Sequence, residues 1–217
     1  MAIEYHLRKH EDKGQFIPQG SGERLMFITH GTSKYTEREE VKMVLDGGCS
    51  WVQLRMKGNM NIFTAREIGQ LINEHTNKCI YCIKDNARNA IRFWAIAVHL
   101  VKEDISVYAA WEMAKEQLFP GETFYIGATA NTFEDIEHAV GQGASYIGLG
   151  PFRYTETKKK LSPVLGLEGY RKIVQQCKEA GYKIPIFAIG GICLEDVTQL
   201  METGITGIAV SGAIIHA

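Results

Sequence analysis

The sequence lacks the features that mark membrane proteins and nucleic-acid-binding proteins. No apolar run approaches the roughly 20 residues that cross a bilayer, and the charged stretch 1–13 has no apolar core of a signal peptide. The 24 Lys and Arg residues nearly cancel the 25 Asp and Glu residues, so the formal net charge is only -1. Nucleic-acid and polybasic membrane-surface binding would need a cationic excess. We therefore expect a cytoplasmic protein that binds neither nucleic acid nor membrane.

The cysteines and prolines are also few. Five cysteines, an odd number scattered through apolar stretches, do not resemble a disulfide framework. Cys79 and Cys82 have the C-x-x-C spacing of redox sites, but residues three apart on a strand point to opposite faces. No Pro-rich or Ser-rich linker divides the chain. The sequence thus predicts one domain over residues 25–217, preceded by an N-terminal extension over residues 1–24.

Short stretches rich in β-branched and other apolar residues alternate with segments whose apolar residues recur every three or four positions. The first pattern is typical of buried strands and the second of amphipathic helices. The expected strands are 25–29, 50–54, 79–83, 95–100, 123–127, 145–149, 185–189 and 206–210. Strict alternation with short connections implies parallel strands and right-handed crossovers.

Eight such units in this length predict an α/β fold, specifically a (β/α)8 TIM barrel. A doubly wound open sheet is the alternative. Only seven residues follow the last expected strand, so we expect the barrel to lack the final outer helix. Residues 1–24, or a neighbouring subunit in a homo-oligomer, would then cover the apolar surface left by that helix; a plain tail is the other interpretation.

The end of the second expected strand carries an unusual pair of cations. Gln53, Arg55 and Lys57 alternate with three apolar residues, so they share the face that would line a barrel lumen. Barrel enzymes place their chemistry at this carboxyl end. Two cations there are costly without an anionic partner. The pattern indicates an anion site, with a solvated strand end as the alternative.

Two carboxylates follow neighbouring strands. Asp85 comes directly after the third expected strand, and Asp104 shortly after the fourth. Adjacent strands lie about 4.8 Å apart, so both carboxylates can reach one ion. Magnesium takes one or two carboxylates and completes its shell with water and substrate phosphates. Beside Arg55 and Lys57, the pair predicts a Mg²⁺-assisted diphosphate site.

Two further loops offer donors for phosphate. The stretch after the sixth strand contains Thr155, Thr157 and Lys158, whose hydroxyl and ammonium groups suit phosphate oxygens, although a solvated basic loop is the alternative. Gly190-Gly191 closes the seventh strand, and Val210-Ser211 closes the eighth. Glycine lets backbone N–H groups approach an anion, and barrels often bind phosphate at these two loops.

Together these segments resemble the thiamine phosphate synthase family over about residues 25–213. The matching motifs, in chain order, are Gln53-Leu54-Arg55-Met56-Lys57, Asp85, Val98-His99-Leu100 with Asp104, Thr155 to Lys158, Gly166-Leu167-Glu168-Gly169 and Gly190-Gly191-Ile192. The resemblance implies a Mg²⁺-dependent transferase that joins hydroxymethylpyrimidine diphosphate to hydroxyethylthiazole phosphate. In this family the diphosphate departs first, and the thiazole nitrogen captures the resulting pyrimidine-methyl cation.

Each matching position inherits an expected role from the resemblance. The expected catalytic residues are Arg55, Lys57 and Lys158, the expected metal ligands are Asp85 and Asp104, and the expected substrate-binding residues are Gln53, Lys84, Thr129, Thr155, Thr157, Gly190, Gly191, Val210 and Ser211. The cations and the metal would stabilise charge that builds on the leaving diphosphate. His99 is expected to pack near the lumen, and His30 stays without a role.

Three positions depart from the family pattern. Lys84 replaces a usual Asn, Lys102 replaces an often-present Gln, and Ser211 lies one position before the serine of many relatives. Either lysine would contact the diphosphate or pair with an aspartate and weaken Mg²⁺ binding. The alternatives are a thiazole tautomerase on the same barrel, which needs no diphosphate or Mg²⁺, and a non-catalytic protein that binds thiazole phosphate or thiamine phosphate.

Overall fold

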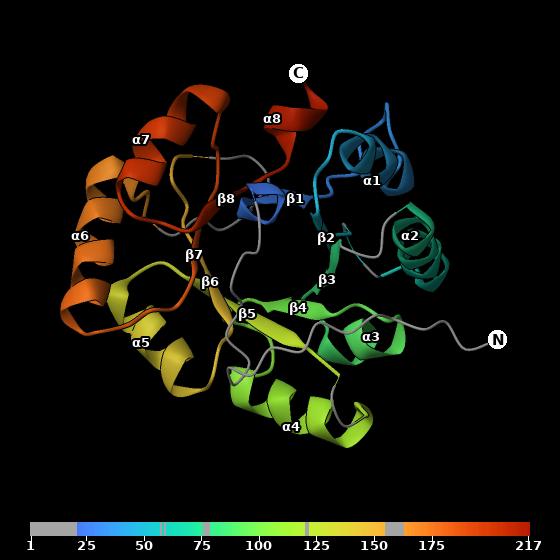
Figure 1. Cartoon of the computed structure of the whole chain (residues 1–217), viewed down its shortest axis with the longest axis horizontal. Coiled ribbons are helices and arrows are strands. Elements are labelled where there is room, and N and C mark those ends of the chain that lie inside the picture. The colour runs from blue at the N-terminus through green and yellow to red at the C-terminus, as the bar shows by residue number, and fades with distance from the viewer. Residues whose placement is uncertain (1–20, 57, 59, 76–78, 120–121, 155–162) are drawn as a thin grey trace.

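The predicted barrel is confirmed. The computed structural model describes residues 21–56, 58, 60–75, 79–119, 122–154 and 163–217. Eight parallel strands close into a barrel in chain order, with β1 paired to β8, and the helices surround them (Figure 1). The closing pair aligns Leu25 with Ile208 and Phe27 with Val210, which rules out the open sheet. Of the expected extension, only residues 21–24 are described, as the short helix η1.

All eight expected strands are present, and helices follow them in strict alternation. The strands are β1 Leu25–Ile28, β2 Trp51–Leu54, β3 Ile80–Lys84, β4 Ala97–Leu100, β5 Tyr125–Ala130, β6 Tyr146–Leu149, β7 Ile186–Ile189 and β8 Gly207–Val210. The helices are η1 Ser21–Arg24, α1 Glu37–Asp46, α2 Ile62–His75, α3 Ala87–Arg92, α4 Val107–Gln117, α5 Phe133–Gly141, α6 Gly166–Glu179, η2 Leu194–Asp196, α7 Val197–Glu202 and α8 Gly212–Ile215. Among the described helices, not one combines the length and apolar character that a bilayer crossing requires.

Large aromatic side chains fill the amino-terminal half of the barrel lumen. Trp51 packs edge-on against Tyr146 and Phe187, with ring centroids 4.9 and 4.7 Å apart. Gly127 leaves the room for this cluster, because a Cβ there would lie 2.1 Å from Cζ of Tyr146. Each of the three aromatic residues is at the first or second position of its strand. Within the described residues, these rings therefore fill the lumen near the starts of the strands, and the cavity described below lies at their carboxyl ends.

Side chains alternate between the lumen and the outer layer, as strand geometry requires. Val52 and Leu54 belong to the outer core beneath the helices, whereas Trp51 belongs to the lumen cluster. The same alternation separates the C-x-x-C pair. Cys79 lies in the outer core and Cys82 in the lumen. The expectation that these two thiols diverge is confirmed, and burial raises the pKa of Cys82 to about 12.

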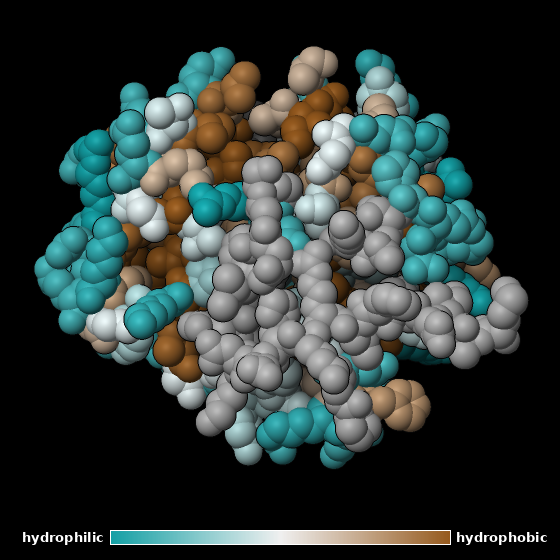
Figure 2. Space-filling model, in the orientation of Figure 1, coloured by the Kyte–Doolittle hydropathy of each residue, from teal (hydrophilic) through white to brown (hydrophobic). Residues whose placement is uncertain are grey.

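The eighth outer position holds one helical turn, α8, where no helical residue was expected. Seven residues after β8 suffice for a single turn of 1.5 Å rise per residue but not for a full outer helix. In Figure 1, α8 lies between α7 and α1, and hydrophobic side chains are visible along this edge in Figure 2. A hollow of about 430 Å³ lies beside it, lined by residues that include Leu25, Met43 and Ile214. The extension 1–24 was one of the expected covers of this surface, and its residues 1–20 lie outside the described residues.

Candidate active site

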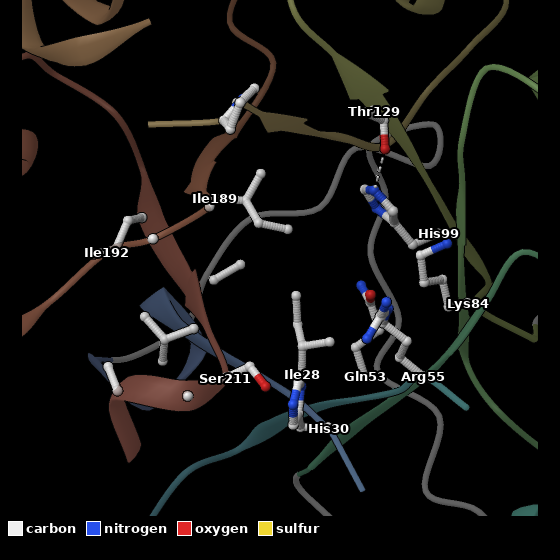
Figure 3. A pocket seen from close by; sticks show the side chains of 18 of the residues that line it. Ile28, His30, Gln53, Arg55, Lys84, His99, Thr129, Ile189, Ile192 and Ser211 are labelled. Carbon is white, nitrogen blue, oxygen red and sulfur yellow. Dashed lines mark hydrogen bonds between the residues drawn. The ribbon is translucent and has the colours of Figure 1, made fainter. Parts of the chain in front are cut away.

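A cavity of about 390 Å³ opens at the carboxyl ends of the strands. All eight strands or the loops that follow them contribute to its lining: Ile28, His30, Gln53, Arg55, Lys84, His99, Val101, Thr129, Asn131, Gly150, Pro151, Ile189, Gly190, Gly191, Ile192, Cys193, Ala209, Val210, Ser211, Gly212 and Ala213. This volume lies within the usual range for small-molecule sites. The polar and charged side chains from β2 to β5 lie along one side, and Ile189, Ile192 and Ser211 lie along the other (Figure 3).

We call the first half of this site the charged side, defined by Arg55, Lys84, Asp85 and Asp104. Arg55 and Lys84 both line the cavity, as the strand alternation predicted for Arg55. Gln53, which shares the face of Arg55, is 2% exposed, and its Nε2 donates a hydrogen bond to Met26 Sδ at 3.3 Å. Gln53 therefore lines the cavity, and the Nε2 atom of its amide is held by Met26.

The two aspartates meet just outside the cavity lining. Asp85 and Asp104 lie close enough that the charge of one acts on the other, and Lys84 Nζ forms an ion pair with Asp85. Asp104 Oδ2 also accepts a hydrogen bond from the backbone N–H of Val101 at 2.8 Å. Partial burial raises the pKa of Asp104, and the neighbouring charge of Asp85 acts in the same direction. Because two neighbouring carboxylates repel each other, a bound cation would stabilise the ionised form of both.

This donor set fits magnesium. Mg²⁺ needs only one or two carboxylates from the protein, and water and phosphate oxygens supply the rest of its octahedral shell. Within the described residues, no group of three or more His, Cys, Asp and Glu side chains is placed to hold a metal ion. The two carboxylates would thus serve a metal that shares its shell with substrate, rather than one enclosed by protein ligands.

Lys84 and Lys102, the two lysines that differ from the family pattern, pair with different aspartates. Lys84 pairs with Asp85 at the cavity, whereas Lys102 Nζ lies 2.6 Å from Asp135 Oδ2 at the start of α5. Asp135 also accepts a hydrogen bond from Asn131 N at 2.8 Å and caps α5 together with Thr132. Lys102 therefore supports the loop after β5, and only Lys84 brings its charge to the cavity.

A hydrogen-bonded pair of side chains connects the neighbouring strands β4 and β5 on the lumen side. His99 Nε2 lies 3.0 Å from Thr129 Oγ1, and both residues line the cavity (Figure 3). The His99 ring is 4% exposed and packs 5.6 Å from the ring of Tyr146. The expected position of His99 near the lumen is confirmed, and the pair orients the Thr129 hydroxyl group at the cavity floor.

We call the opposite half the glycine side, defined by Gly190, Gly191, Val210 and Ser211, all of which line the cavity. Gly190 and Gly191 have φ values of 99° and 68°, which L-residues with side chains rarely adopt. A Cβ on Gly191 would lie 2.4 Å from Cγ of Arg153. Ser211 Oγ is buried and makes no hydrogen bond to any residue that the structure describes. A ligand with acceptor oxygens would satisfy this hydroxyl group.

The structure does not describe four of the predicted site residues: Lys57, Thr155, Thr157 and Lys158.

The cavity also contains residues that the sequence did not assign to the site. The cavity lining adds His30, which had no assigned role, and Asn131 and Cys193, which were not predicted. Asn131 follows the end of β5, so its place after a strand was the available signal. Its side-chain amide donates to the carbonyl oxygen of Gly150.

Residues 25–214 match the protein family described as "Thiamine monophosphate synthase". The chain belongs to this family. The thiamine-phosphate synthase of Bacteroides fragilis is 46% identical over 198 residues, which cover 89% of this chain and 92% of that protein. The corresponding protein of Phocaeicola vulgatus is 48% identical over 194 residues, covering 89% of this chain and 90% of the relative.

A solved structure agrees with this assignment. The thiamine phosphate pyrophosphorylase from Pyrococcus furiosus superposes with a TM-score of 0.75 at 31% identity, covering 90% of this chain and 89% of that one. The family resemblance inferred from the strand-end motifs is thereby confirmed. Membership of the thiamine monophosphate synthase family extends over nearly the whole barrel, so the cavity at its carboxyl face is the place to seek the activity.

Proposed function

We propose that this protein is a Mg²⁺-dependent transferase of thiamine biosynthesis. It joins hydroxymethylpyrimidine diphosphate to hydroxyethylthiazole phosphate and releases thiamine phosphate and pyrophosphate. The observation that carries the proposal is the division of one cavity into a charged side and a glycine side. Each half suits one phosphate-bearing substrate, and the reacting carbon and nitrogen would meet between them.

The reaction depends on stabilising the negative charge of the leaving group rather than on a general base. The C–O bond between the pyrimidine methylene and the diphosphate breaks, and its electron pair leaves with pyrophosphate. The thiazole nitrogen then donates its lone pair to the methylene carbon and forms the new C–N bond. No proton is transferred in either step. Fixed cations that meet the growing charge on the leaving group therefore lower the barrier.

Arg55 and Lys84 are the described residues that supply such cations at the cavity. Their two charges are matched by the carboxylates of Asp85 and Asp104, so these four side chains have no net positive charge to offer a diphosphate. A divalent ion held by Asp85 and Asp104 would supply the missing charge to the departing pyrophosphate. We assign Lys57, Thr155, Thr157 and Lys158 to the same diphosphate through the family motifs.

The glycine side is assigned to the thiazole phosphate. Backbone N–H groups at Gly190 and Gly191 can approach phosphate oxygens closely, and Ser211 Oγ would donate a further hydrogen bond. Val210 would present its backbone beside them. We place the pyrimidine ring near Gln53 and Thr129, where the cavity floor offers an amide and a hydroxyl group oriented by His99.

The test is a reaction of the purified protein with both substrates, with and without Mg²⁺, followed by chromatographic detection of thiamine phosphate. We expect product only when both substrates and Mg²⁺ are present. Binding of thiazole phosphate without product would favour the non-catalytic alternative. Isomerisation of a thiazole phosphate precursor without Mg²⁺ would favour the tautomerase. The synthase names of the relatives favour the transferase over both.

A further inference from the structure

An ion pair beside the glycine side joins two loops that are far apart in the sequence. Arg153 follows β6, and Asp196 lies in η2, after β7. Arg153 Nη1 and Nη2 donate to the two carboxylate oxygens of Asp196, both at 2.7 Å. This bidentate geometry is the strongest form of an arginine–carboxylate contact. The Asp196 side chain is only 13% exposed, whereas the Arg153 side chain is 45% exposed, so the pair is sheltered from solvent on the Asp196 side only.

Arg153 also holds both carbonyl groups of the glycine pair. Its backbone N–H donates to Gly190 O at 3.0 Å, and its Nη1 donates to Gly191 O at 3.1 Å. The carbonyl and N–H groups of a trans peptide point in opposite directions. Since both carbonyls face Arg153, the N–H groups of Gly191 and Ile192 face away from it.

The same loop borders the cavity. Gly190, Gly191 and Ile192 line the cavity, whereas Arg153 is not among its described lining residues. The Arg153–Asp196 ion pair, which we call the clamp, would then hold the N–H groups of Gly191 and Ile192 toward the space where we place the thiazole phosphate. Neither Gly191 nor Ile192 has a side chain that could hold this orientation by a hydrogen bond, so the orientation depends on contacts made by neighbours.

Asp196 fixes the clamp from the other end. Its Oδ2 accepts a hydrogen bond from the backbone N–H of Cys193 at 2.7 Å. Partial burial favours a higher pKa for Asp196, but the hydrogen bonds from Arg153 and Cys193 outweigh it and lower the pKa. The Arg153 guanidinium also lies 4.9 Å from the centroid of the Phe152 ring, a cation–π contact. Arg153 is thus held on several sides before any ligand arrives.

We propose that Arg153 and Asp196 are positioning residues that orient the Gly191 and Ile192 amides for the phosphate of the thiazole substrate. They act through the loop and do not touch the phosphate. The inference rests on the proposed function, because it assumes that thiazole phosphate occupies the glycine side. It assigns the affinity for one substrate to an ion pair outside the cavity.

The experiment compares Arg153→Lys, Arg153→Ala and Asp196→Asn with the wild type. Isothermal titration gives the Kd for hydroxyethylthiazole phosphate alone, and steady-state kinetics gives KM for each substrate. We expect Arg153→Ala to raise Kd and KM for the thiazole phosphate by roughly 10-fold to 100-fold, and the two conservative variants to raise them by about 3-fold to 10-fold. The KM for the pyrimidine diphosphate should stay within about twofold. Arg171→Ala is the matched control, since Arg171 forms an exposed ion pair with Glu168 on α6.

Each result bears on the inference. Wild-type affinity in both Arg153→Lys and Asp196→Asn would overturn it and leave the proposed function intact. Equal rises in both KM values with a lowered melting temperature would indicate a general structural role and would also overturn it. A wild-type protein that binds thiazole phosphate but makes no thiamine phosphate would contradict the proposed function, while the Kd comparison would still test the clamp. A wild type that fails to bind thiazole phosphate would end both.

Discussion

In the proposed function, the two halves of the cavity would bind phosphate by different physical means. The charged side uses side chains from β2, β3 and the loop after β4, in which Arg55 and Lys84 oppose Asp85 and Asp104. The glycine side would use backbone groups of the loops after β7 and β8, where Gly190 and Gly191 have positive φ values and Arg153 donates to the carbonyl oxygen of Gly191. The wall around it is largely apolar, with Ile189 and Ile192 beside it (Figure 3).

This difference decides whether a substitution can reduce activity without also reducing the stability of the fold. A side chain on the charged side can be shortened without changing the backbone, so its loss should reduce turnover and leave stability nearly intact. A backbone site has no such independence, because the conformation that creates it also belongs to the fold. Substitutions on the glycine side should therefore change substrate affinity and stability together.

The largest effect is expected for Arg55→Ala. Removing a fixed cation from the leaving group should reduce kcat by roughly 10²-fold to 10³-fold, the loss typical of one donor to developing charge. The melting temperature should change little, because Arg55 lies at the end of β2 rather than in the aromatic cluster. Arg88→Ala, an exposed position on α3, is the matched control. Loss of folding in Arg55→Ala would instead indicate a structural role.

Gly191→Ala should have the next largest effect. A Cβ at this position would press on Arg153 and displace the clamp, so KM for thiazole phosphate should rise roughly 10-fold to 100-fold. The left-handed conformation adds about 1–2 kcal/mol of strain. Gly181→Ala is the control, because Gly181 has φ of 74° but open space at the Cβ position. The control should lose similar stability with unchanged kinetics; a shift in its KM would mean that strain alone explains the effect.

A smaller effect is expected for Lys84→Met. The substitution removes the ammonium group that pairs with Asp85, so the two aspartates should bind Mg²⁺ about 3-fold to 10-fold more tightly. At the same time KM for the pyrimidine diphosphate should rise, because a cation leaves the cavity. Titration of Mg²⁺ against the free protein, followed by calorimetry, measures the first effect without any turnover. Unchanged or weaker Mg²⁺ binding would show that Lys84 does not compete with the metal.

The smallest effect is expected for Lys102→Gln. Lys102 pairs with Asp135, a partly exposed bridge worth about 0–1 kcal/mol. Because Asp135 retains its cap of α5, the fold should persist. Chemical denaturation measures the stability, and the same Mg²⁺ titration should give the wild-type affinity. A Mg²⁺ affinity that changed as much as in Lys84→Met would remove the distinction between the two lysines.

The fold was predictable because its signals are local. Apolar stretches of strand length alternate with helical periodicity, and strand alternation alone assigned Arg55 to the lumen and separated Cys79 from Cys82. The glycine pair was also predictable, since few other residues suit a tight approach to phosphate. The ion-pair partners of Lys84 and Lys102 were not predictable from the sequence. Both lysines have acidic residues nearby in the sequence, and only the positions of the loops decide which carboxylate each lysine meets.

The sequence by itself therefore determined the barrel, the strand ends that face the cavity and the family to which the chain is similar, since periodicity and residue type act over a few neighbouring positions. Only the tertiary structure decided which charges neutralise one another and how the glycine peptides are turned. Arg153 and Asp196 are 43 positions apart, and no local pattern links them. Their contact depends on two loops whose separation is set by the parallel pairing of β6 with β7.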